Sequence, residues 1–343
     1  MAAPHQQEVN DTEIFIHIHP PATLVTIELI LGIFGIVGNG LVCLTVIRAR
    51  SMHNLTNYLI LNLAVADICV CLCLVVFSEK LFLAFSPQGQ VAGSIYCILC
   101  ADKNATWFFT YSAVLALTLV TLERYVAIVY PFQYPRFFSG VKAACYAIIC
   151  WVIAFLIELP YLFVPRYSLD DKACYYVHLE PVIKGVTAFN TAVITFIAPL
   201  ACMVFSYWRI ISCLRMRARD LIKEGTQSPA YELLVASKKV VKTLLVVTVI
   251  FVITWVPIQT CCSVLSVFPA LGSEFWFLRL YSDLRTVGYI NSVLNVIVYS
   301  IKYKQFRKAF KSIFFPASWN RVNPVNGEIY DTSKGYTNNT HVS

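Results

Sequence analysis

Residues 97–125 read CILCADKNATWFFTYSAVLALTLVTLERY. Residues 97–120 form a mostly apolar stretch, of the length of about 20 residues that a helix needs to cross a bilayer. The stretch leads into Glu123, Arg124 and Tyr125. An acid and an arginine at a membrane edge are costly, and are tolerated when they pair or when breaking the pair is a switch. The rest of the chain decides which of these applies.

The composition excludes an ordinary soluble domain. Of the 343 residues, 58% are hydrophobic and only 13% are charged, whereas soluble domains carry about 25% charged residues. We therefore expect an all-α membrane protein, a bundle of seven transmembrane helices. The seventh helix is the least regular, because Arg279, Asp283 and Arg285 interrupt its first half. The seven apolar stretches are residues 24–47, 58–83, 97–120, 143–164, 182–214, 240–268 and 275–301.

The distribution of lysine and arginine predicts the orientation. Residues 1–47 contain neither, whereas the segments after the first, third, fifth and seventh stretches are rich in both. The positive-inside rule places such segments in the cytosol, so we expect the N-terminus outside and the C-terminus inside. The net charge of +8 lies beside the spans, where it meets anionic lipid and cytosolic partners rather than nucleic acid.

Four regions follow from these patterns. We expect an extracellular tail over residues 1–23, the helix bundle over 24–301 and a disordered cytoplasmic tail over 316–343. The first tail holds Asn10 in an Asn-Asp-Thr triplet, a glycosylation acceptor on the outer side. Residues 302–315 alternate phenylalanines and cations at helical spacing, which predicts an amphipathic helix on the membrane surface. The fifth and sixth helices are expected to extend beyond the bilayer.

Each predicted span carries one or more residues that are unusual in apolar helices. In chain order they are Asn39, Asp67, Glu123-Arg124-Tyr125, Trp151, Pro199, Tyr207, Phe251, Trp255, Pro257, Asn291, Ser292, Asn295 and Tyr299. Taken in this order on the expected spans, they resemble the rhodopsin-like class (class A) of G-protein-coupled receptors over about residues 24–315. The surroundings of Glu123 and of the last span look like neuropeptide receptors of the thyrotropin-releasing-hormone, FMRFamide and galanin kinds.

The resemblance implies a plasma-membrane receptor that couples to a heterotrimeric G protein and, in the same class, to arrestin. It assigns the coupling switch to Glu123, Arg124, Tyr125, Tyr207, Asn295 and Tyr299. It assigns the activation relay above that switch to Val114, Pro199, Phe251, Trp255 and Pro257. One position departs from the family, since Val296 stands where a proline usually follows the asparagine. A helix without that proline is expected to be straighter, with altered basal activity.

Asp67 is an acid inside an apolar run, so it must be protonated, paired or bound to an ion. By resemblance, Asp67, Asn291 and Asn295 form a sodium site that favours the resting state. Ala113 stands where that site often has serine. A network of buried water without an ion satisfies the same polar groups, and the sequence leaves both readings open. No other cofactor and no metal centre is expected.

The resemblance also implies a disulfide between the start of the third span and the second extracellular loop. Cys174 is the cysteine of that loop. Cys97 and Cys100 are both near the expected position of its partner, which by the usual spacing falls on Leu99. Gly93, four residues before Cys97, favours Cys97 as the partner of Cys174.

The ligand class follows partly by exclusion. Tyr289 stands where opsins carry the retinal lysine, and Thr106 stands where receptors for biogenic amines carry an aspartate. Mixed charges with aromatic residues suit a peptide, and a lipid or another small molecule is the alternative. Arg285 faces the cavity and meets either a ligand carbonyl or carboxylate, or a neighbour such as Asp102 or Glu79. The expected pocket comprises Asp102, Lys103, Thr106, Trp107, Gln259, Arg285 and Tyr289.

Two further classes fit the sequence poorly. A transporter usually shows internal repeats or broken helices at the midplane, and no repeat is evident here. An enzyme of the membrane interior needs paired catalytic groups at one depth, and the six histidines lie away from the centres of the spans. We therefore expect a receptor without catalytic residues.

Overall fold

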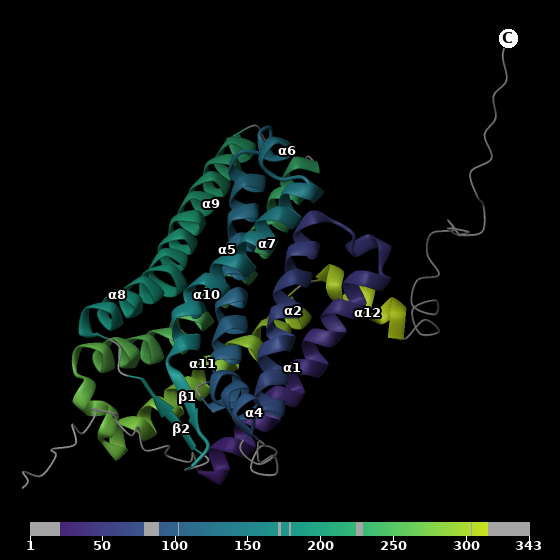
Figure 1. Cartoon of the computed structure of the whole chain (residues 1–343). Coiled ribbons are helices and arrows are strands. Elements are labelled where there is room, and N and C mark those ends of the chain that lie inside the picture. The colour runs from purple at the N-terminus through teal and green to yellow at the C-terminus, as the bar shows by residue number, and fades with distance from the viewer. Residues whose placement is uncertain are drawn as a thin grey trace, which may run out of the picture.

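The computed structural model describes residues 21–78, 89–101, 103–170, 173–177, 180–223, 229–302 and 304–314. Long helices run side by side through these residues and form a bundle (Figure 1). The long helices are α1 (Ala22–Arg48), α2 (Leu55–Val76), α5 (Asn104–Val129), α7 (Gly140–Glu158), α9 (Ala198–Lys223), α10 (Pro229–Val267) and α11 (Phe275–Lys302).

Six helical segments of the described residues are long and apolar enough to cross a membrane. They are Ala22–Arg48, Leu55–Val76, Gly89–Val129, Gly140–Phe163, Val182–Leu221 and Leu245–Val267. The seventh helix, α11, has 28 residues and packs between α1 and α10. It is long enough to cross as well, but Arg279, Asp283 and Arg285 lower its hydropathy. The prediction of an all-α bundle of seven membrane helices is confirmed.

The outer surface of the bundle is apolar, and its interior combines a hydrophobic core with buried polar groups. Phe34 and Ile253 are more than 60% exposed on its outer surface, where lipid chains replace water. Asp67 and Asn295 are buried between helices, because a polar group in the membrane must find partners within the protein.

The short elements distinguish the two ends of the bundle (Figure 1). At one end lie α4 (Gly89–Tyr96) and a hairpin of β1 (Pro165–Ser168) and β2 (Ala173–Tyr176), followed in the chain by α8 (Pro181–Ala192). We call it the disulfide end. At the other end lies α6 (Tyr134–Phe137), just after α5. We call it the Arg124 end.

Several helix boundaries differ from those predicted. The second helix ends at Val76, seven residues before the predicted end at 83; residues 79–88 lie outside the described ones. The third span starts earlier, at Gly89, and α5 continues to Val129. Hydropathy finds only the apolar part of a helix, whereas backbone hydrogen bonds carry the helix on through the polar residues of 89–96. Caps mark other starts accurately: the Asn54 side chain accepts from the N–H of Asn57 before α2.

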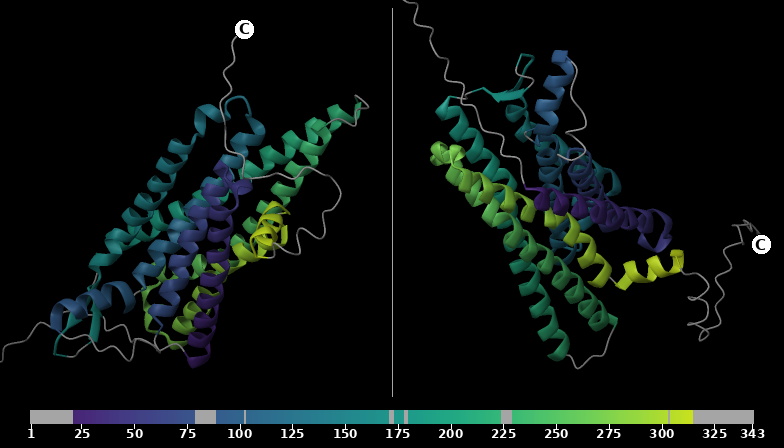
Figure 2. Two further views of the ribbon diagram at one scale, coloured as in Figure 1. Left: turned by 90° about the vertical axis from the view of Figure 1, so that its right-hand side faces the viewer. Right: turned by 90° about the horizontal axis from the view of Figure 1, so that it is seen from below.

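Helices α9 and α10 project beyond the other helices at the Arg124 end (Figure 2). They reach Lys223 and start at Pro229, as the basic flanks of this connection predict. Helix α12 (Lys304–Phe314) follows α11 and contacts α1. Phe306 is buried against the bundle while Arg307 is exposed, so α12 is amphipathic as predicted. Residues 1–20 with Asn10, and residues 315–343, lie outside the described ones.

Candidate functional site

Arg124 and Glu123 form a bidentate ion pair at the Arg124 end. The Arg124 Nε donates to Glu123 Oε2 at 2.7 Å, and its Nη2 donates to Oε1 at 2.9 Å. The Glu123 side chain is fully buried. Two charge-assisted hydrogen bonds to a buried carboxylate are strong, so Arg124 and Glu123 form a closed pair in this conformation.

Two further side chains hold the Glu123 carboxylate, and neither was identified from the sequence. The hydroxyl of Thr56, on α2, donates to it at 3.0 Å, and that of Tyr134, on α6, donates at 2.6 Å. Burial and the bond to this carboxylate raise the pKa of the Tyr134 hydroxyl, which therefore stays protonated and donates. Thr56 and Tyr134 are 67 and 11 residues from Glu123 in sequence, so no spacing rule connects them.

Tyr207, one of the tyrosines predicted to meet Arg124, contacts another residue of α5 instead. The Tyr207 hydroxyl lies 3.2 Å from the Thr121 hydroxyl, one turn before Arg124 on α5. The Tyr125 ring packs edge-on against Tyr130 and near Phe205. The side chain of Tyr299 lies outside the described residues. In this conformation Arg124 is therefore paired with Glu123, and Tyr207 contacts Thr121.

Aromatic rings connect the middle of the bundle to its disulfide end. The Trp255 ring centroid lies 5.8 Å from that of Phe251 and 6.4 Å from that of Trp107. Phe251 in turn lies 6.1 Å from Phe196. Val114, Phe251 and Trp255 belong to one buried core cluster. The structure therefore brings these relay residues together, from α5 and α10.

Pro199 and Pro257, the two prolines of the predicted relay, affect their helices differently. A π-helical turn, Val193–Ile197, precedes Pro199, because proline has no N–H to donate one turn back. Pro257 stands inside α10, which continues through it. Near it, the hydroxyl of Thr254 donates to the carbonyl of Ile250 at 2.9 Å. Each proline lacks the N–H that a helical hydrogen bond needs, so each weakens its helix locally.

The buried polar cluster forms as predicted from α1, α2 and α11. Asn295 Nδ2 donates to Asp67 Oδ2 at 3.1 Å, and Asn39 Nδ2 donates to the Ser292 carbonyl at 3.1 Å. Three acceptor oxygens have no hydrogen-bond partner among the described residues: Asp67 Oδ1, Asn291 Oδ1 and Asn295 Oδ1. Buried acceptors of this kind suit a hard cation or bound water.

Val296 leaves α11 without the proline of the family pattern. The helix runs unbroken from Phe275 to Lys302, so the Val296 N–H is available for the helical hydrogen bond. The side chain also fills the space beside Gly38 on α1, where an added Cβ would lie 2.9 Å from Val296 Cγ1. The substitution thus joins α1 and α11 closely.

At the disulfide end, two predicted pocket residues, Lys103 and Arg285, lie beside an acid that was not predicted. Glu28 of α1 is buried, and its Oε2 accepts from Lys103 Nζ at 2.9 Å. Its Oε1 accepts from Thr286 at 2.9 Å and lies 4.0 Å from Arg285 Nη2. Arg285 therefore faces Glu28; the partners named from the sequence, Asp102 and Glu79, lie outside the described residues. An acid in an apolar span is itself a signal of function, and this signal at Glu28 was overlooked.

The other predicted pocket residues lie around the same aromatic rings. Trp107 lies 6.5 Å from Tyr289, between ring centroids, and Lys103 Nζ lies 6.0 Å from the Tyr289 centroid. Thr106 is buried on α5, and Gln259 is half-buried on α10. The Tyr289 hydroxyl and Trp255 Nε1 are buried without a hydrogen-bond partner in the described part of the chain.

A disulfide joins Cys97 to Cys174, which confirms the favoured pairing. It fastens β2 to the start of the third span. Gln90 Nε2 donates to the Tyr167 carbonyl at 3.1 Å, and a Cβ at Gly93 would lie 2.1 Å from the Tyr167 ring. The absence of a side chain at Gly93 therefore lets the hairpin approach α4.

Comparisons with known proteins agree with this architecture. A family model described as "7 transmembrane receptor (rhodopsin family)" matches residues 38–299, more than half of the chain. The galanin receptor type 2 of Homo sapiens is 31% identical over 301 residues, covering 86% of this chain and 74% of the relative. The galanin receptor 2b of Danio rerio is 29% identical over 309 residues, covering 87% and 76%. The alpha-1A adrenergic receptor of Rattus norvegicus is 28% identical over 340 residues, covering 86% and 70%. The chain therefore belongs to the rhodopsin family of seven-transmembrane receptors.

Proposed function

We propose that this protein is a peptide receptor that passes an extracellular signal to a heterotrimeric G protein and catalyses no reaction. The observation that carries the proposal is the closed Glu123–Arg124 pair at one end of the bundle, opposite a charged and aromatic cluster at the other. Similarity to galanin receptors supports a peptide as the ligand. The disulfide end faces outward, because disulfides persist in oxidising surroundings, and the N-terminus lies on the same side of the plasma membrane.

Signalling is a shift between two populations of the bundle. In the closed population, Glu123 holds Arg124. Outward movement of the projecting ends of α9 and α10 exposes Arg124 to the G protein, and afterwards to arrestin. Tyr207 then leaves Thr121 and turns inward with Tyr299. Ligand and G protein each stabilise the open population by their differential affinity for it.

The signal travels through the aromatic chain. A ligand that presses on Trp107 moves Trp255, whose ring contacts Phe251. Phe251 is packed in the core, and cores respond to such shifts by changing between discrete packings. Pro257 and the π-helical turn before Pro199 provide the weak points at which α10 and α9 bend.

A peptide fits the charged cluster better than an amine does. The alpha-1A adrenergic receptor is a relative of similar identity, yet Thr106 supplies no carboxylate for a ligand ammonium group. A lipid or other small molecule remains the alternative to be compared experimentally.

The proposal includes the hypothesis that a sodium ion binds in the Asp67 cluster. Asp67, Asn291 and Asn295 supply the three unpartnered oxygens, and a bound sodium ion would add positive charge that stabilises the closed bundle. If sodium binds, the melting temperature of purified receptor is higher in sodium chloride than in N-methylglucamine chloride, and Asp67→Asn removes the difference. Equal melting temperatures of the unaltered receptor in the two salts favour the water network.

Cells expressing the chain, screened with galanin-like and other neuropeptides, test the proposal by G-protein activation. Arg124→Ala is the signalling-dead control, with surface expression measured in parallel. A peptide response that Arg124→Ala abolishes at equal surface expression supports the proposal. Activation by lipid fractions alone would favour the alternative, and ion flux through the purified protein without a G protein would favour a transporter.

A further inference from the structure

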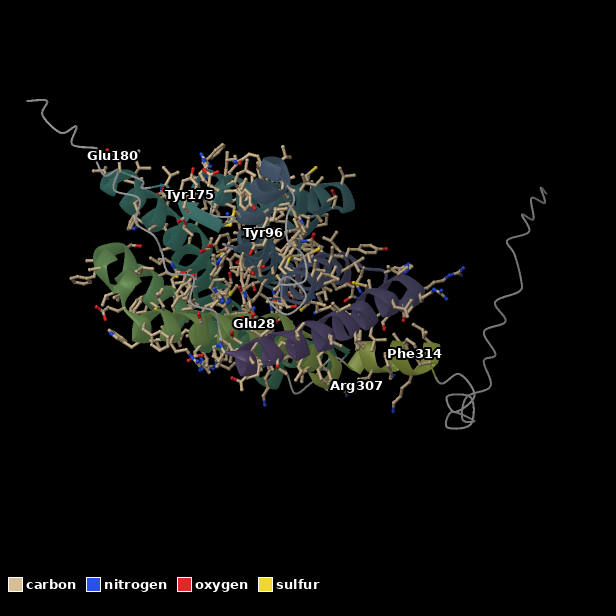
Figure 3. All side chains as sticks on the ribbon, turned by 60° about the horizontal axis from the view of Figure 1, so that its bottom comes forward. Glu28, Tyr96, Tyr175, Glu180, Arg307 and Phe314 are labelled. Carbon is tan, nitrogen blue, oxygen red and sulfur yellow. A yellow bond between two sulfur atoms is a disulfide. The ribbon has the colours of Figure 1, made fainter. Side chains whose placement is uncertain are left out.

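The charged cluster at the disulfide end joins three helices through one carboxylate. Glu28 comes from α1, Lys103 precedes α5, and Arg285 and Thr286 come from α11. Figure 3 places Glu28 on α1, near the end of the bundle. We call these four residues the Glu28 cluster. Such an ion cluster is costly to bury, so its position among the expected ligand-contacting residues calls for a functional explanation.

The two cations are bound unequally by this carboxylate. Lys103 Nζ lies 2.9 Å from Glu28 Oε2, the length of a charge-assisted hydrogen bond. Arg285 Nη2 lies 4.0 Å from Oε1, too far for a hydrogen bond. The side chains of Lys103 and Arg285 are 15% and 14% exposed, whereas that of Glu28 is 4% exposed. An incoming group therefore reaches the cations before it reaches Glu28.

The backbone of Lys103 is unusual. Its φ of 55° lies in the left-handed region, a backbone conformation that residues other than glycine rarely adopt. It stands between the π-helical turn Cys97–Ala101 and the start of α5. Such conformations persist only where the surroundings hold them, and they gather at ligand-binding positions. Here the conformation accompanies an ammonium group that points to α1.

Buried polar groups near the cluster that lack a hydrogen-bond partner indicate which ligand group would bind here. The Tyr289 hydroxyl and Trp255 Nε1 have no hydrogen-bond partner among the described residues, although buried polar groups normally have one. Lys103 Nζ lies 6.0 Å from the Tyr289 ring centroid. A tryptophan N–H only donates, as do ammonium and guanidinium groups. Because donors prevail here, the partner is an acceptor, and a negatively charged one.

We infer that the Glu28 cluster binds a carboxylate of the ligand, and that Glu28 is its internal counter-ion in the empty receptor. The ligand carboxylate takes Lys103 from Glu28 and accepts hydrogen bonds from Arg285, whose planar fork matches a carboxylate. Glu28 keeps the bond from Thr286. The inference rests on the proposed peptide receptor and specifies its ligand: a peptide with a free carboxylate, at its C-terminus or on an acidic side chain near that end.

The exchange also explains why an acid of the first helix takes part. While Glu28 holds Lys103, it connects α1 to the start of α5 across the bundle. A ligand carboxylate breaks that connection. It binds Lys103 and Arg285 together and so links the start of α5 to α11 instead. Binding therefore changes contacts between helices, as a ligand that shifts a population must do.

Peptides of one sequence, made with a free C-terminal carboxylate or with a C-terminal amide, test the inference on cells expressing the unaltered chain. We expect the acid form to activate at a concentration at least about tenfold lower, as the loss of a charge-assisted contact implies. An amide that is equally or more potent overturns the inference while leaving the receptor proposal intact. This comparison needs no variant, so it does not depend on the folding of any altered protein.

Variants then show which residues cause the preference for the acid form of the peptide. Lys103→Gln and Arg285→Gln are each expected to abolish the preference for the acid. Glu28→Gln is expected to lower the concentration of acid peptide required, because the competing carboxylate is gone. Arg279→Gln is the matched control, since Arg279 lies on the same helix in an exposed pair with Asp283. A Glu28→Gln receptor at normal surface level that requires more acid peptide contradicts the exchange.

A third outcome is that neither the acid nor the amide form of any peptide activates the receptor. In that case the peptide proposal fails, and the carboxylate inference is judged from acyl acids against their amides on the same cells. A preference for acids that Lys103→Gln abolishes supports the inference with a small-molecule ligand. No response to either set overturns it.

Discussion

Glu123 shows how a single buried residue is held by three helical segments. Its carboxylate accepts from Arg124, from Thr56 and from Tyr134. The ion pair with Arg124 is predictable, because the two residues are adjacent. The bonds from α2 and α6 depend on helix packing, and they fix the carboxylate in the position in which it binds Arg124.

Tyr134→Phe removes one charge-assisted hydrogen bond from Glu123, a loss of about 1.5–3 kcal/mol. Since that bond helps to hold the closed pair, we expect a several-fold rise in ligand-independent G-protein activation per receptor at the cell surface. Tyr146→Phe is the control, because its hydroxyl donates to the Phe137 carbonyl and not to Glu123. Unchanged basal activity in Tyr134→Phe would show that the bond is not part of the lock.

Gly93→Ala tests the close approach of Tyr167 to α4. An added Cβ would lie 2.1 Å from the ring, so either the ring or the hairpin must move, at a cost of typically 1–3 kcal/mol. We expect a lower melting temperature and less receptor at the cell surface. Gly185→Ala is the control, because no atom lies within 4 Å of its added Cβ. Tyr167→Ala in addition should restore part of the loss; no recovery would argue against the contact.

At the scale of elements, α11 departs most from the family pattern. It carries three charged residues in its first half and no proline after Asn295. The charged half pairs with α1 through Glu28, and the second half packs Val296 against Gly38. Both features tie α11 to α1, which stabilises the closed arrangement of these helices.

Val296→Pro removes one N–H of α11 and thereby its helical hydrogen bond to the Ser292 carbonyl. We expect higher basal and ligand-stimulated activation, because the helix becomes easier to bend beside Asn295. Val296→Ala separates the two possible causes, since it removes the side chain from Gly38 and keeps the N–H. If the alanine variant raises activity as much as the proline variant, then packing rather than backbone bonding holds the helix.

At the scale of the whole molecule, the Cys97–Cys174 disulfide connects parts that are 77 residues apart. Closing a loop of this length stabilises a chain by about 4 kcal/mol in the entropic account. Cys97→Ser is therefore expected to lower the melting temperature clearly and to reduce the response to ligand, because the hairpin is no longer held covalently beside α4 and the π-helical turn. Cys145→Ser, at an exposed free cysteine, is the control. A Cys97→Ser receptor with unaltered melting and response would show that Tyr167 packing suffices to hold the hairpin.

The sequence by itself determined the membrane fold, the order of the helices and the inner residues of the switch. Spans follow from apolar length, because every residue facing lipid contributes to the local pattern. The resemblance to the receptor family, carried by motifs in order along the chain, identified Asp67, Asn295, Trp255 and Phe251 as an interior group, and Cys174 as one half of the disulfide. The ends of α2 and of the third span could not be predicted, since hydropathy does not mark the residue at which helical backbone hydrogen bonding begins or ends.

Only the tertiary structure decided which distant side chains meet. Thr56 and Tyr134 reach Glu123, and Glu28 reaches Lys103 and Arg285, through helix rotations that no local pattern records. Each of these contacts joins residues of different helical segments, so its geometry depends on how the segments pack. The physical reason is that burial forces each polar group to find a partner, while packing chooses which one.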